Sequence, residues 1–413
     1  MLKTVLENES RQVFAEEQFQ QALHIYYEKL YPFKTLFKWL SYGDPLYILK
    51  REIAFTTLND RYIRHKSFQS EEDFQQYIFK KNPAKIDIGA VCHVPPRDYA
   101  VVPVCRPIEK ELVFDIDIND YNEVRTCCKE TDICPKCWKF ICLACKILER
   151  ILIEDFGFKH LLWVFSGRRG VHCWVSDKVA RQLSNEERCS ILAYINLIKG
   201  NTNVQRKVHL PSKPLHSSVQ RALEIITKNF IDFIIIEQDI LNEDNNGLHK
   251  FLKLLWDCRQ NEFKQVMSKC KTSIERWNAF VIHLNLLQKS NCLPNKLKYL
   301  KEEIMLHYTY PRLDMAVTQS LDHLLKAPFC IHAKTGKVCI PFRVSDMDKF
   351  NVIQVPTLSV VLDELNNYYQ KQTLNNHFNI YKSDKNFECN HILNTSLCDS
   401  YNILLNFVME LEL

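Results

Sequence analysis

Glycine is scarce in this sequence, with eight residues in a chain of 413. Neither a G-x-x-x-x-G-K-[ST] loop nor a G-x-G-x-x-G turn is present, so phosphate binding cannot depend on a glycine-rich loop ahead of a helix. Three of the eight glycines, Gly157, Gly167 and Gly170, fall within one short stretch. That concentration makes the stretch a first place to look for a ligand-binding turn.

Long apolar runs and a strong net charge are also lacking. No run approaches the ~20 residues needed to span a bilayer, and the opening MLKTVLENES has early charges without the apolar core of a secretory signal. We therefore expect no membrane partner. The net charge of +5 permits a nucleic-acid partner but does not argue for one, since a DNA-coating protein would usually be more basic.

Length, apolar residues and cysteine are in good supply. The length suggests two domains, or one domain enlarged by an insertion. Apolar residues make up 46% and charged residues 25%, an ordinary globular balance. Seventeen cysteines in a large chain without a signal sequence favour a reducing compartment, with most of them buried as small apolar residues and some serving as metal ligands.

Residues 1–176 alternate between helix-like and strand-like patterns. An amphipathic helix is predicted over about 14–40, broken at Pro32. Strand-like runs flank a turn at Asn59-Asp60, and SEEDFQQYIFKK predicts a helix capped near Ser70. KIDIGAV and ELVFDIDI predict strands, and LLWVFSGRRGVHCWV predicts a strand–turn–strand unit.

The pattern changes near residue 177. Residues 177–300 carry long helical periodicities with few β-branched runs, which predicts a helical subdomain. Strand-like segments resume near PRLD, which begins at Pro311, and at KVCIPFRV. The expected organisation is an α/β core formed by 1–176 and 301–355, interrupted by the helical subdomain and followed by a C-terminal tail, 356–413.

The run ELVFDIDIND contains the first chemical signal. Side chains alternate along a strand, so Asp115 and Asp117 face one way while Phe114, Ile116 and Ile118 face the other. Two carboxylates one pleat apart cannot both stay ionised at low cost without a cation, and Mg²⁺ or Mn²⁺ would supply one. The plain alternative is a polar edge in solvent, although the apolar neighbours favour an interior strand.

A third carboxylate would complete such a site. The candidate is Asp314 in PRLDMAV, where a strand would place it on the same face as Arg312. Taken alone, Asp314 would be an ordinary surface aspartate.

The turn SGRRGVHCW carries a hydroxyl, two arginines and a histidine between apolar strands. Its glycines, Gly167 and Gly170, allow a tight turn and close approach of the backbone to a ligand. Arg168 and Arg169 offer forked donors suited to phosphate oxygens, and His172 could add a further donor. The alternative is a basic hairpin tip in solvent. With the acidic strand, an anion-binding turn suits phosphoryl transfer, which depends on positioning and charge neutralisation.

A dense cysteine cluster lies between these two elements, in RTCCKETDICPKCWKFICLACK. Four neighbouring thiolates fit a tetrahedral structural Zn²⁺. One possible ligand set consists of Cys127, Cys128, Cys134 and Cys137. Spacing alone also allows a set in which Cys142 and Cys145 replace the first pair, and reduced cysteines without metal are a third possibility. We expect the later pair on a helix that packs inward.

Five segments, in order, are similar to the motif series of the small catalytic subunit of eukaryotic DNA primases. These are KELVFDIDINDYNEVRTCC, DICPKCW, EDFGFKHLLWVFSGRRGVHCWV, EIMLHYTYPRLDMAV and HLLKAPFCIHAKTG. LYPFKTLFKWLSYGD, KREIAF, DRYIRHKSF and NPAKIDIGAV resemble the N-terminal region of that family. The resemblance implies the archaeo-eukaryotic primase fold, an α/β fold with mixed sheets, an inserted all-helical subdomain and a structural zinc motif at about 125–140.

The resemblance also implies roles for individual residues. The catalytic carboxylates, holding two Mg²⁺ or Mn²⁺ ions, would be Asp115, Asp117 and Asp314. The nucleotide-binding residues would be Ser166, Arg168, Arg169, His172, Lys326, His332, Arg64, Lys85 and Asp87. The zinc ligands would be Cys127, Cys128, Cys134 and Cys137, which leaves Cys142 and Cys145 outside the set.

The activity implied is synthesis of short RNA primers from NTPs on a single-stranded DNA template, in the nucleus. The implied partners are a large primase subunit, forming a heterodimer, and the DNA polymerase alpha complex. A stand-alone primase-polymerase that also uses dNTPs is one alternative, opposed by the cysteine cluster and the helical insertion. A zinc-stabilised nucleic-acid-binding module is another, opposed by the mild charge, because strong backbone binding needs a more basic surface.

Overall fold

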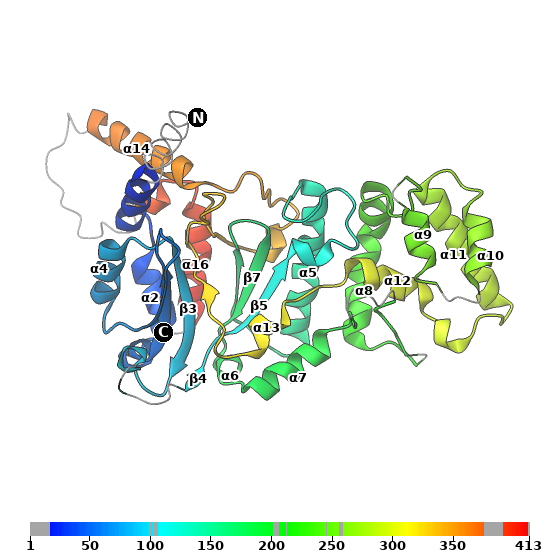
Figure 1. Cartoon of the computed structure of the whole chain (residues 1–413), viewed down its shortest axis with the longest axis horizontal. Coiled ribbons are helices and arrows are strands. Elements are labelled where there is room, and N and C mark those ends of the chain that lie inside the picture. Colours follow the sequence, from blue (N-terminus) through cyan, green and yellow to red (C-terminus); the bar gives the residue numbers. More distant parts are fainter. Residues whose placement is uncertain are drawn as a thin grey trace, which may run out of the picture.

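The computed structural model describes residues 17–99, 101, 106–200, 206–211, 213–244, 246–255, 259–375 and 391–411. The described chain is elongated, with two β-sheets at one end and in the middle, and a group of helices at the other end (Figure 1). Within these residues, no helix is both long and apolar enough to cross a membrane.

The first sheet, sheet A, is formed by N-terminal strands and one late strand. Its order is β2-β1-β3-β4, and β8 also pairs with β3. The strands are β1 Arg51–Thr56, β2 Tyr62–Lys66, β3 Lys85–Cys92, β4 Pro107–Glu109 and β8 Leu325–Lys326. The expected hairpin is β1–β2, and Asp60 in its turn has a φ of 54°, a left-handed conformation that Asp tolerates better than most residues.

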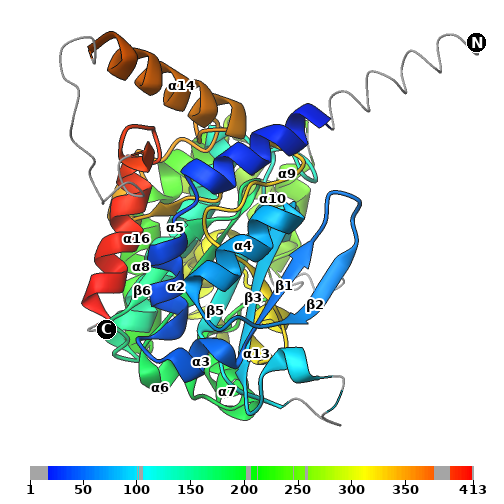
Figure 2. The same cartoon turned by 90° about the vertical axis from the view of Figure 1, so that its left-hand side faces the viewer.

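Helices cover one face of sheet A (Figure 2). The predicted amphipathic helix forms as 17–29 followed by α2, Phe33–Ser41, with Pro32 at the break. α4, Glu71–Lys81, begins as expected at Ser70, whose side chain accepts a hydrogen bond from the Asp73 N–H. Since Phe55 of β1 packs against Tyr77 of α4 with ring centroids 4.9 Å apart, the opposite face of the sheet is the one left to carry polar side chains.

The second sheet, sheet B, has the order β5-β7-β6-β9. Its strands are β5 Leu112–Asp117, β6 Leu161–Phe165, β7 Gly170–Val175 and β9 Pro341–Phe342. The α/β class is confirmed. Every named strand pair in the described residues is antiparallel, which refines the expectation of mixed sheets. Only a short part of KVCIPFRV forms a named strand.

The other helices lie beside the two sheets or at the far end of the molecule (Figure 1). α5, Pro135–Glu154, packs Trp138 on Phe165 of β6, with ring centroids 5.8 Å apart. The short helices near the sheets are α3 Pro45–Leu49, α6 Lys178–Arg181, α7 Asn185–Ile195 and α13 Met315–Gln319. The helices at the far end are α8 Ser217–Phe230, the π-helix η3 Ile231–Glu237, α9 Gly247–Leu252, α10 Gln260–Met267, α11 Ser273–Lys289 and α12 Leu300–Thr309.

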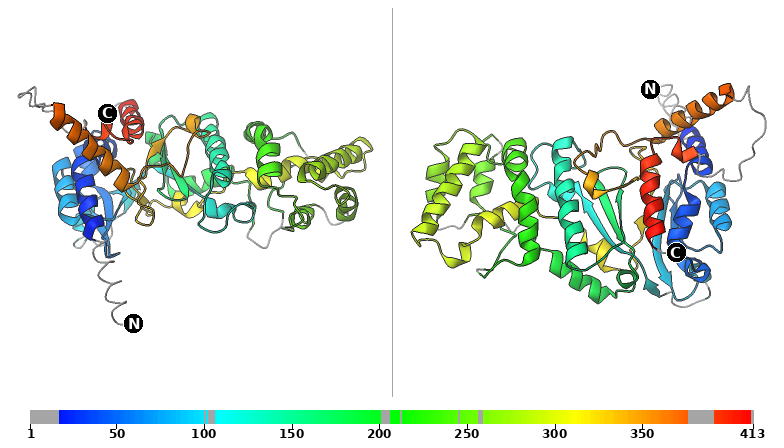
Figure 3. Two further views of the ribbon diagram at one scale, coloured as in Figure 1. Left: turned by 90° about the horizontal axis from the view of Figure 1, so that it is seen from above. Right: turned by 180° about the vertical axis from the view of Figure 1, so that it is seen from behind.

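Part of the C-terminal segment returns to the sheets. After α14, Leu358–Asn375, the last helix α16, Cys398–Glu410, runs beside α2 (Figure 3). Trp39 of α2 contacts both neighbours, with its ring 5.8 Å from Phe407 of α16 and 5.4 Å from Trp174 of β7. Its indole N–H also donates to the Ser176 hydroxyl at 3.1 Å. α2 therefore sits between sheet B and the last helix.

A buried ion pair joins the two sheets. Arg51, the first residue of β1, donates to both carboxylate oxygens of Glu111, just before β5, at 2.9 and 3.0 Å, and neither side chain is exposed. The Tyr42 hydroxyl donates to the same carboxylate at 2.7 Å. Burial pushes the pKa of Glu111 up, but the Arg51 guanidinium outweighs it and holds the pKa at about 2.

We predict that Glu111→Gln lowers the free energy of unfolding by about 3–5 kcal/mol, because it leaves the Arg51 charge buried without its partner. The measurement is denaturant unfolding at neutral pH. The matched control is Glu262→Gln, which removes an exposed pair with Arg259 worth less than about 1 kcal/mol. Equal shifts for the two variants would show that the Arg51 pair does not hold the sheets together.

The same pair predicts a dependence on pH. The pKa of Glu111 in the folded chain lies below its ordinary value of 4.5, so its contribution is complete above that pH and is lost as pH falls toward 2. The Glu111→Gln variant should therefore lose less free energy of unfolding than the wild type as the pH falls from 4.5 toward 2.

Candidate functional site: an acidic strand facing cationic side chains

The acidic strand has the predicted alternation. Phe114 and Ile116 of β5 are fully buried, whereas the side chains of Asp115 and Asp117 on the other face are 24% and 27% exposed. Asp115 pairs across the sheet with His172 of β7. The two carboxylates therefore lie on the edge strand of sheet B, not on the interior strand that the apolar neighbours favoured, and they reach the surface on a shared face.

Asp314 meets this strand, but in a different way from the one predicted. Residues 311–314 form no strand, so the expected strand face shared with Arg312 is wrong. Instead, the Asp314 N–H donates to the Asp115 carbonyl at 3.0 Å, and its carboxylate accepts from the Ala316 N–H at the start of α13. Pro311 lacks an N–H for a strand ladder, and capping gives Asp314 an alternative partner.

The carboxylates of this cluster lie close enough to repel one another. Burial, followed by repulsion from Asp117, Asp314 and Asp120, raises the pKa of Asp115 to about 7. Burial, Asp117 and Asp314 likewise raise the pKa of Asp120 to about 6. Such a cluster gains most from a divalent cation, which removes the repulsion and prefers oxygen ligands. Asp120 was not singled out from the sequence, although it stands in the same DIDIND run.

The SGRRG turn is built by hydrogen bonds at its two ends. The Ser166 N–H donates to the Gly170 carbonyl at 2.9 Å, and the Gly170 N–H donates to the Ser166 hydroxyl at 3.1 Å. Gly167 has a φ of 90°, and a Cβ there would lie 2.5 Å from the Cβ of His332. A Cβ on Gly170 would lie 2.5 Å from the Ile116 carbonyl. Both close approaches need glycine, as the sequence suggested.

Two side chains of this turn and strand meet the acidic cluster. Arg169 donates from Nε to the Asp117 carboxylate at 2.6 Å. His172 is buried, with Nε2 3.8 Å from the Asp115 carboxylate. Burial, with the Lys326 and Lys85 charges, lowers the pKa of His172 to about 3, so the ring is neutral at physiological pH. Its Nδ1 is buried without a hydrogen-bond partner among the described residues.

Sheet A brings a second group of polar side chains to the same place. Asp87 of β3 pairs across the sheet with Lys326 of β8, and Lys85 lies 2.8 Å from the Asp87 carboxylate. Lys326 Nζ donates to the Ser166 carbonyl at 3.4 Å, which connects the two sheets. One oxygen of Asp87 is buried, and no described residue hydrogen-bonds to it.

His332 and Arg64 complete the predicted set. Burial, with the Lys326, Arg168 and Arg169 charges, lowers the pKa of His332 to about 4, and its Nδ1 is another buried atom that no described residue satisfies. Arg64 is held by the Glu52 carboxylate at 2.9 and 3.0 Å. Its neighbour Tyr62, which the sequence did not single out, interacts with the Asp87 carboxylate. Burial and that carboxylate raise the pKa of Tyr62 to about 12.

The arrangement therefore places acidic oxygens on one side and cationic or neutral donors on the other. Three polar atoms, on Asp87, His172 and His332, are buried without partners in the described chain. Buried polar groups normally have partners, and the exceptions call for a ligand or water. Carboxylates for divalent ions beside donors for phosphate oxygens are the equipment of enzymes that transfer phosphoryl or nucleotidyl groups.

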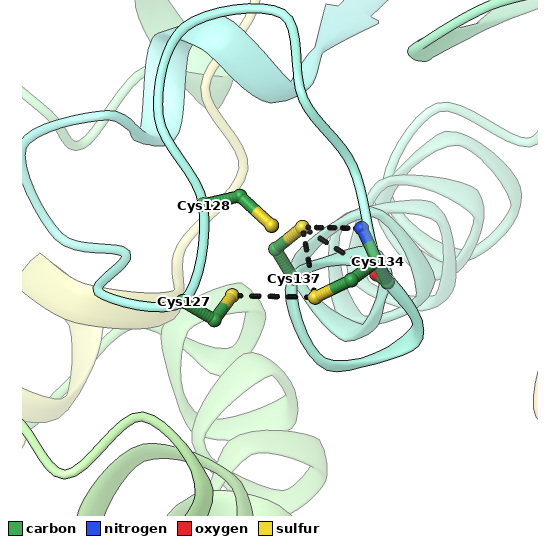
Figure 4. Close-up of side chains that lie close together, drawn as sticks. All are labelled: Cys127, Cys128, Cys134 and Cys137. Carbon is green, nitrogen blue, oxygen red and sulfur yellow. Dashed lines mark hydrogen bonds between the residues drawn. The ribbon is translucent and has the colours of Figure 1, made fainter.

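The cysteine cluster forms a separate site. The Sγ atoms of Cys127, Cys128, Cys134 and Cys137 all lie within 4.8 Å of one another, and the four side chains converge (Figure 4). They are the ligand set that the resemblance implied, and they could hold a metal ion. Cys142 and Cys145 are buried on α5, as expected, and point elsewhere.

Residues outside the cluster support it. Gln238, at the end of η3, donates to Cys127 Sγ at 3.4 Å and accepts from the Thr126 N–H at 2.9 Å. Hydrogen bonding, first from Cys137 and also from Gln238, lowers the pKa of Cys127 to about 5. Thiolate is the form that binds metal. Gln238 lies 111 residues away in sequence, so no local pattern could have revealed it.

Comparison with known proteins agrees with these observations. A family model described as DNA primase small subunit matches residues 114–344. The DNA primase small subunit of Drosophila melanogaster is 40% identical over 371 residues, covering 86% of this chain and 84% of that protein. That of Saccharomyces cerevisiae is 38% identical over 378 residues, covering 84% and 90%. The polymerase domain from Mycobacterium tuberculosis Ligase D in complex with DNA aligns with a TM-score of 0.36 and 11% identity, covering 81% of this chain and 87% of that one.

The family is settled by these matches. The chain belongs to the DNA primase small subunit family. It is accordingly an enzyme of the nucleotidyltransferase class.

Proposed function

We propose that this chain synthesises short RNA primers on single-stranded DNA, joining NTPs by nucleotidyl transfer at the site between the two sheets. The observation that carries the proposal is the acidic cluster of β5 and α13, faced by donors from the SGRRG turn, β3 and β8. This arrangement would meet the two requirements of the reaction, ligands for divalent ions and a cradle for a triphosphate.

Asp115, Asp117 and Asp314 would hold Mg²⁺ or Mn²⁺. The fit rests on the oxygen-only donor set and on the burial and mutual repulsion that together raise the pKa of Asp115 to about 7. When bound, two such ions lower the pKa of the primer 3′-hydroxyl and neutralise the leaving pyrophosphate. The hydroxyl oxygen bonds to the α-phosphorus as the bond from that phosphorus to the bridging oxygen of pyrophosphate breaks.

The cationic side orients the nucleotide. Arg168, Arg169, Lys326 and His332 would hold the triphosphate. The neutral His172 and the Ser166 hydroxyl would add donors in a dry environment, where hydrogen bonds are strong. The pair Lys85 and Asp87 would lie toward the ribose and phosphates of the nucleotide, and so would Arg64. Arg169 now donates to Asp117, so it would have to release that carboxylate to reach a phosphate.

The four cysteines would hold a structural Zn²⁺, with all four positions taken by protein and none left for catalysis. Family membership supports the remaining proposals, which are a heterodimer with a large primase subunit, association with DNA polymerase alpha, and a role in replication in the nucleus.

The test is extension of an RNA primer on a DNA template by the purified chain with Mg²⁺ or Mn²⁺, comparing NTPs with dNTPs. Extension that prefers NTPs supports the proposal. Equal use of dNTPs would favour a primase-polymerase, and no extension even with the large subunit present would contradict the proposed activity.

The Gly167 contact yields a further prediction. We expect Gly167→Ala to lower kcat/KM for NTP by roughly 10- to 100-fold, because the new methyl must displace His332 and the turn that carries Arg168. Gly157→Ala is the matched control. Gly157 also has a positive φ, 72°, but nothing lies within 4 Å of its added Cβ. Similar kinetics for the two variants would show that the close approach is unimportant.

A further inference from the structure

The outer edge of sheet A carries, next to Arg64, exposed side chains to which the proposed reaction assigns no role. β2 is an edge strand, and Tyr62 on it is 48% exposed. The short 3₁₀ helix η1, Pro96–Asp98, lies against β2, and Tyr99 immediately after it is 46% exposed. The Tyr99 ring stacks face to face on His65 of β2, with centroids 4.1 Å apart and an interplanar angle of 0°. We call this surface the β2 rim.

Basic side chains surround these rings. Residues 60–66, 93–99 and 106 include five arginine or lysine residues but only two acidic ones. The cations are Arg61, Arg64, Lys66, Arg97 and Arg106, and the acids are Asp60 and Asp98. Of the five cations, Arg64 is the one that forms an ion pair within the described chain, with Glu52. The residues whose charges face solvent, because they are exposed, are Arg61, Arg97 and Arg106. The rim is thus locally basic, in contrast with the mild charge of the whole chain.

The rim is continuous with the candidate nucleotide site. The Tyr62 hydroxyl interacts with Asp87, which lies beside Lys326. Arg64 lies on the same strand, one residue from His65. A chain passing from the acidic cluster over Asp87 would therefore reach Tyr62 first and then the His65–Tyr99 stack.

We propose that the β2 rim binds the single-stranded DNA template beside the reaction site, an inference that rests on the proposed function. Flat aromatic faces accept unpaired bases by stacking, and interleaved cations contact successive phosphates. A paired duplex would hide the faces of its bases, so the rings select a single strand. Rings separated by charged side chains make a poor apolar interface for a protein.

The test is binding of a fluorescein-labelled oligothymidylate to the full-length chain, followed by fluorescence anisotropy. Tyr99→Ala should weaken binding roughly 5- to 150-fold, the range expected for one lost stacking contact. Tyr99→Phe should bind like the wild type because it keeps the ring. Arg97→Gln should reduce the slope of log affinity against log salt by about 0.7, the value for one phosphate contact to a single strand.

Tyr194→Ala is the matched control, since Tyr194 is 43% exposed on α7, away from the rim. Melting temperature and metal content of each variant show that the fold is intact. The inference is overturned if the wild type does not bind the oligomer, or if Tyr99→Ala and Arg97→Gln both bind like Tyr194→Ala. A loss seen with oligouridylate alone would likewise overturn assignment to the DNA template.

The outcome is separable from that of the proposed reaction. Asp115→Asn should bind the oligomer like the wild type, because Asp115 lies outside the rim. Extension by Asp115→Asn at the wild-type rate would contradict the proposed reaction while leaving the binding result in place. Normal binding of the oligomer by the rim variants would contradict template binding at the β2 rim and would leave the proposed reaction untouched. In extension assays, Tyr99→Ala should raise the KM for template and leave the KM for NTP unchanged.

Discussion

Asp115→Asn is expected to lower primer extension at least about a thousand-fold, because a site that loses a ligand for divalent ions forfeits several kcal/mol of transition-state stabilisation. The amide keeps the size of the carboxylate but not its charge. Because burial, followed by repulsion from neighbouring carboxylates, raises the pKa of Asp115 to about 7, removal of its charge should not destabilise the fold. Single-turnover extension with saturating NTP measures the effect.

The matched control for this prediction is Asp348→Asn. Asp348 is an exposed aspartate that pairs with Lys146 and takes no part in the acidic cluster, so its loss should leave extension unchanged. A thermal unfolding curve for Asp115→Asn at or above the wild-type midpoint is also expected. Extension by Asp115→Asn within about tenfold of the wild type would remove Asp115 from the proposed ligand set.

The other large effect concerns the cysteine cluster. Cys134→Ser should release the bound metal and lower the free energy of unfolding by more than about 4 kcal/mol, because the loss of a structural metal is among the most destabilising single changes. Cys134 Sγ lies 3.6 Å from Cys127 Sγ and 3.8 Å from Cys137 Sγ, so it is central to the group. We expect a midpoint lower by on the order of 10 °C.

The comparison uses Cys189→Ser, the same substitution at an exposed cysteine of α7. Zinc content by mass spectrometry of metals and thermal unfolding are measured together. A structural zinc at this cluster would be contradicted if Cys134→Ser retained a full equivalent of zinc, or if it unfolded at the same midpoint temperature as Cys189→Ser. Serine is only slightly smaller than cysteine, so the loss of packing alone cannot account for the expected fall in the free energy of unfolding.

Much of the α/β part could be predicted from local patterns. Alternation places Asp115 and Asp117 on one face of β5, and capping chemistry places the start of α4 at Ser70. Gly167 was recognised as a ligand-approach position because glycine is scarce in the chain. These features depend on neighbouring residues, which a sequence displays directly.

The features of the site that could not be predicted depend on contacts between residues far apart in the sequence. Asp314 was expected on a strand, but its N–H pairs with the Asp115 carbonyl from a segment that then starts α13. The Arg51–Glu111 pair and the support of Cys127 by Gln238 join residues 60 and 111 positions apart. Tyr62 and Asp120 stand inside the quoted segments DRYIRHKSF and ELVFDIDIND, but only their proximity to Asp87 and Asp117 in the fold shows that they belong to the site.

Binding of Mn²⁺ tests, without relying on turnover, whether the carboxylates of β5 and α13 hold the divalent ions of the reaction. Electron paramagnetic resonance of free Mn²⁺ is followed as it is titrated into the chain together with an NTP analogue that cannot transfer its nucleotide. We predict about two tightly bound ions per chain in the wild type and their loss in a chain carrying Asp115→Asn and Asp117→Asn. Equal Mn²⁺ binding by both chains would contradict the account.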